Sequence, residues 1–328
     1  MVAGVRRLNG YDGFFTAKKI LITGATGFVG ACLAHRLVAL GGEVHCLTRA
    51  ASNRWRLADI AGRITEHVAD LTDHAGLEAL IGEIKPRIVY HLAAYGGYPF
   101  QQDRERMLET NLKATVNLLH ACACIGFEAF VNTGSSSEYG PKTAPMKETD
   151  LLEPVTAYGV TKSAATLYAR FLGLRERLPV VTLRLFSPFG YYEEPTRLVP
   201  TVIKACLGGE RPKLANGRAA RDFIFIDDVI DVYCLIASRQ GIQGEIFNVG
   251  LGVQHSVAQV AAKIIELTGA AVEPDWGSQD GRVYDSDLWV SDNTKLKAFL
   301  NWTPRYSLEE GLHRTIDWFR AHGGLYAI

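Results

Sequence analysis

Three features are scarce in this sequence: an excess of charge of one sign, long apolar runs and a cysteine framework. Lysine plus arginine and aspartate plus glutamate balance at 35 each, so we expect no nucleic acid among the partners, because polyanion-binding chains carry a basic excess. No apolar run is long enough to cross a bilayer, and the N-terminal segment lacks the apolar core of a signal peptide, so we expect a cytoplasmic protein with no membrane partner. The six cysteines form no CxxC pair or ligand cluster, which favours a reducing compartment and no metal site.

A tyrosine and a lysine four positions apart open an apolar segment with helical periodicity at residues 156–162. A helix turns once in about 3.6 residues, so Tyr158 and Lys162 would lie one turn apart on one face. An ammonium beside a phenol stabilises the phenolate and lowers the tyrosine pKa, which suits a proton donor or acceptor for a carbonyl/alcohol couple. By itself the pair is also typical of a solvated helix face.

A glycine-rich turn joins the first predicted strand, residues 19–23, to a helix predicted over residues 31–40. Gly24, Gly27 and Gly30 stand in this turn. Glycine lets the backbone approach a pyrophosphate closely, and the N–H groups at the start of a helix hold its charge. Strand, glycine turn and helix in this order predict the phosphate-binding unit of a dinucleotide-binding fold.

The alternation of strand and helix patterns then continues. Further strands are predicted at residues 43–48, 66–69, 87–93, 129–133, 180–186 and 245–249, and helices at 77–84, 107–124, 157–177, 257–267 and 308–321. This alternation predicts an α/β fold with a Rossmann-like, doubly wound parallel sheet. Ligands of such sheets bind beyond the carboxyl ends of the strands, where Gly24, Ala93, Ser135 and Phe186 fall, so we expect these residues to be near in space.

The alternation of strand and helix patterns becomes less regular after Gly190, which predicts a smaller C-terminal domain interwoven with the first. We expect a loose N-terminal extension at residues 1–17 and a dinucleotide-binding domain at 18–190, to which residues 223–250 return. The second domain then comprises residues 191–222 and 251–328. No linker separates the two domains.

Seven motifs follow one another in the order found in extended short-chain dehydrogenases/reductases. They are Gly24-x-x-Gly27-x-x-Gly30, His91-Leu-Ala-Ala94, Ser135-Ser-Ser-Glu-Tyr-Gly140, Tyr158-x-x-x-Lys162, Arg184-Leu-Phe-Ser-Pro-Phe-Gly190, Arg221-Asp-Phe-Ile-Phe-Ile-Asp-Asp228 and Phe247-Asn-Val-Gly250. Within that family the chain resembles the nucleotide-sugar epimerases, dehydratases and ketoreductases, over nearly all residues after 18. The motifs are specific for the family but not for the reaction, because one constellation serves several chemistries there.

The resemblance implies hydride transfer between a nicotinamide and a sugar carbon. Tyr158 would be the acid/base for the sugar oxygen, and Lys162 would bind the nicotinamide ribose and lower the tyrosine pKa. Ser135 would hydrogen-bond the same oxygen. The alternative for Ser135, Ser136 and Ser137 is a strand-end turn that satisfies free backbone groups.

Two departures from the family pattern bear on the reaction. The 4,6-dehydratases that the chain resembles carry Asp and Glu directly after the hydroxyl residue, where this chain has Ser136 and Ser137. A hydroxyl is a poor substitute for a carboxyl in eliminating water, so dehydration by that route is not expected. Glu138 follows one place later. It would face away if the strand continued, although a turn could bring it round, and a surface or ion-paired glutamate is the alternative to a catalytic one.

The end of the second strand bears on the cofactor. NAD-binding relatives place an acidic residue there, whereas NADP-binding ones supply an arginine. Here the strand ends Thr48-Arg49, and no carboxylate near in sequence would repel a 2′-phosphate from Arg49. We therefore predict NADP(H), with NAD(H) as the alternative, and the other reading of Arg49 is that it merely begins a loop. The resemblance implies cofactor contacts at Gly24, Thr26, Gly27, Phe28, Val29, Gly30, Thr48, Arg49, Asp70, Leu71, Leu92, Ala93, Ala94, Asn111, Tyr158, Lys162 and Phe186.

For the substrate, the resemblance implies a nucleotide-diphosphate sugar. Arg221 and Arg282 match positions that hold the diphosphate in relatives, and their alternative is a surface ion pair. The loop of residues 95–100 would border the sugar. Further substrate contacts are expected at Tyr95, Ser136, Ser137 and Ser187, and the resemblance implies a homodimer.

Taken together, the residues favour an NADPH-dependent reductase of a nucleotide-linked keto-sugar, with a 4-keto-6-deoxyhexose as the expected sugar. An NAD-dependent nucleotide-sugar epimerase is the first alternative. A non-catalytic dinucleotide sensor is the second, and the complete set of Ser135, Tyr158 and Lys162 argues against it.

Overall fold

The computed structural model describes residue 11 and residues 13–278 and 286–326. The chain divides into two compact units. The first contains the chain up to Thr133, Ala164–Thr182 and Ile230–Ile246, and the second contains Gly134–Ser163, Leu183–Val229 and the chain from Phe247 onward. These bounds differ from the predicted domains, because residues 134–163 and 183–190 belong to the second unit rather than to the first. Of the predicted return at 223–250, only residues 230–246 belong to the first unit.

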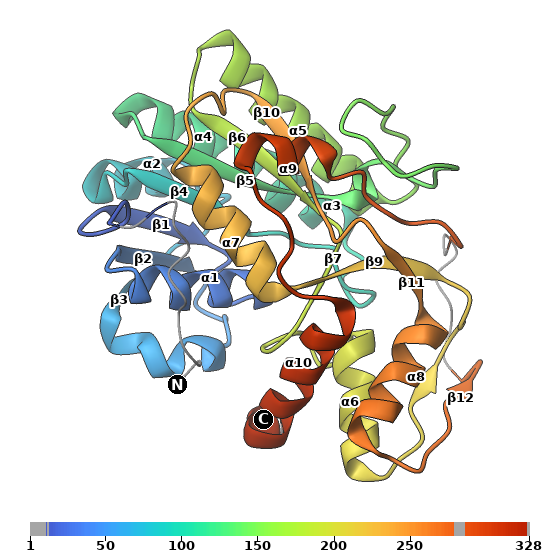
Figure 1. Ribbon diagram of the computed structural model, residues 1–328. Helices are drawn as coiled ribbons and strands as arrows, with labels where there is room; N and C mark the ends of the chain where they lie inside the picture. The colour runs from blue at the N-terminus through green and yellow to red at the C-terminus, as the bar shows by residue number, and fades with distance from the viewer. Residues whose placement is uncertain (1–10, 12, 279–285, 327–328) are drawn as a thin grey trace. The chain divides into compact units, whose positions relative to one another are not determined.

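Seven strands form one sheet in the order β10-β6-β5-β4-β1-β2-β3. Figure 1 shows β3, β2, β1 and β4 side by side, and the pairings from β5 to β3 are all parallel. The predicted Rossmann-like, doubly wound α/β class is confirmed. The strands are β1 Lys19–Thr23, β2 Glu43–Thr48, β3 Ile64–Val68, β4 Ile88–His91, β5 Ala129–Ser135, β6 Val180–Leu185 and β10 Glu245–Val249.

Helices cover both faces of the strands in the first unit. Alternate strand residues point to opposite faces, and Leu21, Val89 and Phe130 join one apolar core with side chains of α2, α4 and α5. On the other face the Tyr90 hydroxyl donates to the Tyr233 carbonyl of α7. The helical segments are α1 Phe28–Ala39, η1 Trp55–Arg63, α2 His74–Ile84, α3 Arg104–Met107, the π-helical turn η2 Leu108–Lys113, α4 Ala114–Ile125, α5 Ala157–Arg175 and α7 Ile226–Ala237.

The second unit combines short sheets with three helices, α6, α8 and α10, that pack against one another. A three-stranded sheet has the order β11-β9-β7, and β12 pairs with β8. The elements are η3 Ser136–Glu138, β7 Ser187–Phe189, α6 Leu198–Gly208, β8 Lys213–Leu214, β9 Ala220–Phe225, β11 Gln254–Ser256, α8 Val257–Thr268, β12 Asp275–Trp276, α9 Thr294–Leu300, α10 Leu308–His322 and η4 Gly323–Tyr326.

Several predicted elements need correction. Helix α1 begins at Phe28 rather than residue 31, because Gly27 has extended backbone and serves as its N-cap. Helix α6 was not predicted: Pro200 lies in its first turn, where a proline removes no helical hydrogen bond. Within the predicted extension before residue 18, the described Tyr11 and Phe15 are buried, with 5% and 1% exposure. The short helices η1 and α9 were also not predicted.

Candidate active site

The glycine turn of the first unit brings two backbone segments into close contact. Gly24 has φ +71°, and a Cβ atom there would lie 2.6 Å from the backbone nitrogen of Ala93. A Cβ atom on Gly30 would collide with the carbonyl oxygen of Gly24. Only glycine fits both positions. The predicted proximity of Gly24 and Ala93 is therefore confirmed, whereas Ser135 and Phe186 belong to the other unit.

The start of helix α1 has the features of an anion site. Its N-cap, Gly27, offers no side-chain hydrogen bond, and its first turn contains no acidic residue. The first N–H groups of such a helix point outward with partial positive charge. This partial charge suits the binding of a pyrophosphate. Thr26 lies in the turn, and Phe28 and Val29 lie in the first turn of α1.

The end of β2 is more acidic than the sequence suggested. The Thr48 hydroxyl donates to Glu66 Oε1 at 2.6 Å, and Arg54 Nε donates to the same oxygen at 2.5 Å. These contacts lower the pKa of Glu66, the Thr48 bond most of all. Arg49 is exposed, and its charge helps to lower the pKa of Asp70, after the two hydrogen bonds from Thr72. The argument that no carboxylate lies near Arg49 is therefore wrong in three dimensions.

The segment after β4 is fixed by Asn111 of the π-helical turn. The Asn111 Oδ1 accepts the Tyr95 N–H, and its Nδ2 donates to the Tyr95 carbonyl, both at 2.8 Å. Leu92, Ala93 and Ala94 precede this anchor. Asn111 is fully buried, so the contacts the structure gives it position the loop of residues 95–100, and cofactor contact by Asn111 stays a prediction.

In the second unit, the serine turn after β5 forms a reciprocal cap. The Ser137 N–H donates to Ser135 Oγ at 3.1 Å, and the Ser135 N–H donates to Glu138 Oε1 at 2.8 Å. The strand-end alternative for Ser135 is thus realised. This turn is compatible with the predicted hydrogen bond from Ser135 to the sugar oxygen, because a hydroxyl that accepts one hydrogen bond still has its own proton to donate.

Tyr158 and Lys162 lie one turn apart at the start of α5, as predicted. Tyr158 is half-buried and Lys162 is 2% exposed. Burial lowers the pKa of Lys162 to about 8, and the negative charge of Glu138 opposes this shift. Lys162 is therefore still an ammonium at neutral pH, close to the pH at which it would lose its proton. The solvated-face alternative is wrong for Lys162.

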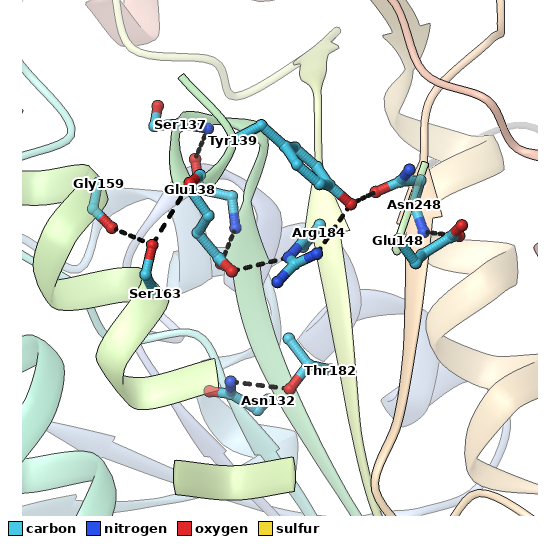
Figure 2. A network of polar contacts seen from close by, with 11 residues as sticks. Asn132, Ser137, Glu138, Tyr139, Glu148, Gly159, Ser163, Thr182, Arg184 and Asn248 are labelled. Carbon is cyan, nitrogen blue, oxygen red and sulfur yellow. Dashed lines mark hydrogen bonds and ion pairs between the residues drawn. The ribbon is translucent and has the colours of Figure 1, made fainter. Parts of the chain in front are cut away.

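Glu138 is the centre of a buried polar network, shown in Figure 2. Its side chain is 0% exposed, and Arg184 Nε donates to Glu138 Oε2 at 2.7 Å. Arg184 also donates to the Tyr139 hydroxyl, which donates to Asn248 Oδ1 at 2.7 Å. Glu138 is thus an ion-paired glutamate and not a surface one, because the turn η3 brings the side chain inward, and a catalytic role for it stays a prediction.

The Ser136 hydroxyl is hydrogen-bonded to a tryptophan from a distant segment. The Trp289 indole N–H donates to Ser136 Oγ at 2.9 Å, and Ser136 is 5% exposed. Trp289 also packs in one buried cluster with Phe186. The contact that the structure gives Ser136 is therefore structural, and its predicted substrate contact is not tested. Ser137 is half-buried and Ser187 lies in β7 with 9% exposure.

Of the two predicted diphosphate arginines, the structure describes one. Arg221 lies on β9, and its guanidinium stands 5.6 Å from the ring centre of Trp289. Asp222, the next residue of the same motif, is buried and accepts hydrogen bonds from the backbone of Leu251 and Gly252 and from Ser291. Arg282 lies outside the described residues.

Within residues 11, 13–278 and 286–326, no group of three or more His, Cys, Asp or Glu side chains is arranged to hold a metal ion. In that same part of the chain, every helix is too short or too polar to span a membrane.

Comparison with known proteins places this geometry in a family. Residues 20–250 match the model of the NAD dependent epimerase/dehydratase family. The chain belongs to this family. Membership confirms the predicted resemblance and makes the chain an NAD(P)-dependent enzyme of the oxidoreductase type.

Individual members of the epimerase/dehydratase family are similar over nearly the whole chain. A UDP-glucose 4-epimerase of Mycolicibacterium smegmatis is 31% identical over 312 residues, which cover 92% of this chain and 98% of that protein. An epimerase of Methanothermobacter thermautotrophicus has TM-score 0.88 and 27% identity, with 96% of each chain covered. The UDP-glucuronic acid 4-epimerase of Bacillus cereus, solved with UDP-glucuronic acid and NAD, has TM-score 0.83 and 26% identity, covering 92% of this chain and 99% of that one.

Sequence reasoning missed two residues that contact predicted site residues, Glu66 in the first unit and Trp289 in the second. Both act on residues far away in the chain, since Trp289 is 153 positions from Ser136 and Glu66 is 18 positions from Thr48. One signal could have found Glu66. It lies on β3, whose predicted pairing with β2 would have placed a carboxylate beside the end of that strand.

Proposed function

We propose that this enzyme is a nucleotide-sugar epimerase that uses bound NAD. Glu66 is the observation that carries this choice over the NADPH-dependent reductase. Its carboxylate engages Thr48 and Arg54 at the end of β2. A 2′-phosphate would bring further negative charge beside Glu66 and Asp70, whereas the two ribose hydroxyls of NAD would meet acceptors there. The similar B. cereus epimerase with bound NAD supports this proposal.

The glycine cradle would hold the pyrophosphate of the dinucleotide. A bound nicotinamide supplies hydride chemistry at a sugar carbon. Epimerisation also requires one group that takes the proton of the sugar hydroxyl and later returns it. Tyr158 would suit both steps, because an ammonium one turn away, that of Lys162, favours the phenolate form of a phenol. Ser135, with its hydroxyl proton available, would hold the same oxygen.

Dehydration is not proposed. The Ser136 hydroxyl accepts a hydrogen bond from Trp289. Neither Ser136 nor Ser137 has the carboxyl that elimination of water by the dehydratase route needs.

The NADPH-dependent reduction of a nucleotide-linked keto-sugar is the second candidate. One observation favours it: Arg49 directly follows β2 and is exposed, and the last residues of β2 itself are not acidic. An arginine in this position suits a 2′-phosphate.

The first experiment is to denature freshly purified protein and identify the nucleotide it releases. Near-stoichiometric NAD, together with interconversion of UDP-glucose or UDP-glucuronic acid and their C4 epimers without net oxidation, is the expected result. Protein that is empty or carries NADP(H), and that consumes NADPH with a 4-keto-6-deoxy nucleotide sugar, would replace the epimerase by the reductase.

We further propose a homodimer that uses the exposed face of α5. Leu167, Phe171 and Leu174 recur at helical spacing there and are 53%, 53% and 55% exposed. Phe171→Glu should give a monomer in light scattering, whereas Leu207→Glu, a change at an exposed leucine of α6, should not. A monomeric native protein would refute this proposal.

A cytoplasmic location stays a prediction from the sequence.

A further inference from the structure

The turn η3 and the first turns of α5 are in direct contact. Ser163 Oγ lies 3.5 Å from the Glu138 carbonyl oxygen and 2.8 Å from that of Gly159. A side chain on Gly159 would collide with the carbonyl oxygen of Ser137. The segment that carries Ser135 is therefore packed against the segment that carries Tyr158 and Lys162.

Glu138 is held rigidly inside this contact. One carboxylate oxygen accepts the Ser135 N–H and the other accepts Arg184 Nε. Arg184 is held in turn by the Tyr139 hydroxyl, and Tyr139 by Asn248, whose own N–H donates to Glu148. Figure 2 shows the chain of bonds from Glu138 to Glu148. A carboxylate fixed in this way cannot turn toward solvent.

The charges around Glu138 are unequal. Two buried cations, Arg184 and Lys162, are 1% and 2% exposed, and Glu138 is the buried anion that interacts with both. Tyr139 and Glu148 are further titratable groups of the same network: burial raises the pKa of the Tyr139 phenol, and the charge of Glu148 adds to this shift. An ammonium buried without an anion loses its proton at lower pH, because burial penalises the charged form. Glu138 therefore has a task that the Arg184 pair alone does not explain.

We propose that Glu138 is a positioning residue of the reaction: its carboxylate fixes the backbone that carries the Ser135 hydroxyl, and its charge is the counter-ion of the Lys162 ammonium. This inference rests on the proposed function. It adds that one buried carboxylate orients the hydrogen-bond donor and also maintains the charge that tunes Tyr158.

Three variants test the proposal, each first checked for folding by circular dichroism. Glu138→Gln removes the charge but retains an oxygen for the Ser135 N–H. Glu138→Asp retains the charge but withdraws the oxygen by one methylene. Glu148→Gln is the matched control, a half-buried carboxyl of the same network that accepts the Asn248 N–H.

The expected results differ in kind. In Glu138→Gln, activity should be lost at a pH lower by about one unit or more than in the native enzyme, because Lys162 loses its proton earlier. In Glu138→Asp, the pH profile should stay and kcat should fall about tenfold with little change in KM, because Ser135 is less well placed. Glu148→Gln should keep both the profile and kcat.

A second readout does not need turnover. The phenolate absorbance of Tyr158, taken as the difference from Tyr158→Phe, should appear at higher pH in Glu138→Gln than in the native protein. The same titration separates the two proposals: a native protein that converts no nucleotide sugar would refute the proposed function, while this shift would still support the role of Glu138.

An unchanged pH profile and an unchanged phenolate titration in folded Glu138→Gln would overturn the proposal. So would equal losses in Glu138→Gln and Glu148→Gln without a shift, which would mean that the network is only structural. If Glu138→Gln does not fold, Glu138→Asp decides: native kcat in that variant would overturn the proposal.

Discussion

The glycine turn after β1 and the serine turn after β5 each follow a strand of the same sheet, but their construction differs. Around Gly24 and Gly30, backbone atoms occupy the space that a Cβ atom would need. In the serine turn, the buried Glu138 carboxylate pairs with Arg184 and caps Ser135. The first turn is therefore sensitive to added volume, and the second is sensitive to removed charge or hydrogen-bonding groups. The predictions below test this difference.

The largest effect is expected for Tyr158→Phe in the second unit. Loss of the phenol proton should lower turnover about 10²–10⁴-fold while the protein keeps its stability and its bound dinucleotide. Tyr168→Phe, a change farther along the same helix, serves as the control and should keep full activity. Steady-state rates and the nucleotide released on denaturation measure both properties. Substantial turnover in Tyr158→Phe would remove Tyr158 from the reaction.

Gly30→Ala should instead destabilise the first unit. The added methyl meets the carbonyl of Gly24, so the free energy of unfolding should fall by about 2–3 kcal/mol and dinucleotide binding should be lost. Gly82→Ala is the matched control: it is also a helical glycine, nothing lies within 4 Å of its added Cβ, and it should raise stability by up to about 1 kcal/mol. Thermal melting and dinucleotide titration distinguish the two. Tight binding by Gly30→Ala would mean that the turn can open without loss.

Glu193 is another buried carboxyl group in the second unit and tests the effect of buried charge. It is 5% exposed, Arg197 is its ion-pair partner at 3.8 Å, and burial raises its pKa from 4.5 to about 8. Between these two values the folded protein binds the proton more tightly than the unfolded chain, so stability falls as the pH rises through this window. Glu193→Gln should remove that slope and be more stable than the native protein at pH 8 by about 1–2 kcal/mol.

Melting curves from acid to mildly alkaline pH measure this effect. Glu210→Gln, at an exposed glutamate of the same unit, should keep the native slope. Parallel melting curves for Glu193→Gln and the native protein would show that Glu193 is not protonated in the folded state.

The smallest effect is expected at the end of β2. Glu66→Gln removes the carboxylate beside Thr48, so binding of NADP(H) relative to NAD(H) should rise about three- to tenfold. Glu109→Gln, at a surface ion pair with Lys113, should leave the ratio unchanged. Competitive titration with both dinucleotides gives the ratio. A ratio unaffected by Glu66→Gln would place cofactor choice elsewhere, with Arg49 as the next residue to change.

Features that depend on local spacing could be predicted from the sequence. The Tyr158 and Lys162 pair follows from the period of a helix, and the glycine cradle follows from a strand, three glycines and a helix in order. The bounds of β1 and β2 agree with the predicted ones for the same reason, because each is a short apolar run that stops at a polar or glycine boundary.

Features that depend on burial could not be predicted in this way. A glutamate such as Glu138 is usually solvated, and its inward direction follows from the 3₁₀ turn at the end of β5. Helix α6 could not be predicted because its first turn contains a proline, which indicates a helix break unless the start of the helix is known.

The sequence by itself determined the family and the parallel fold, and it predicts the reacting side chains, because motifs and periodicity act over a few residues. Only the tertiary structure decided which partners those side chains have. Glu66 reaches Thr48 from the neighbouring strand, Arg184 reaches Glu138 across 46 positions, and Trp289 reaches Ser136 across 153. Such pairs are set by packing between distant segments, and the charge of the site follows from them.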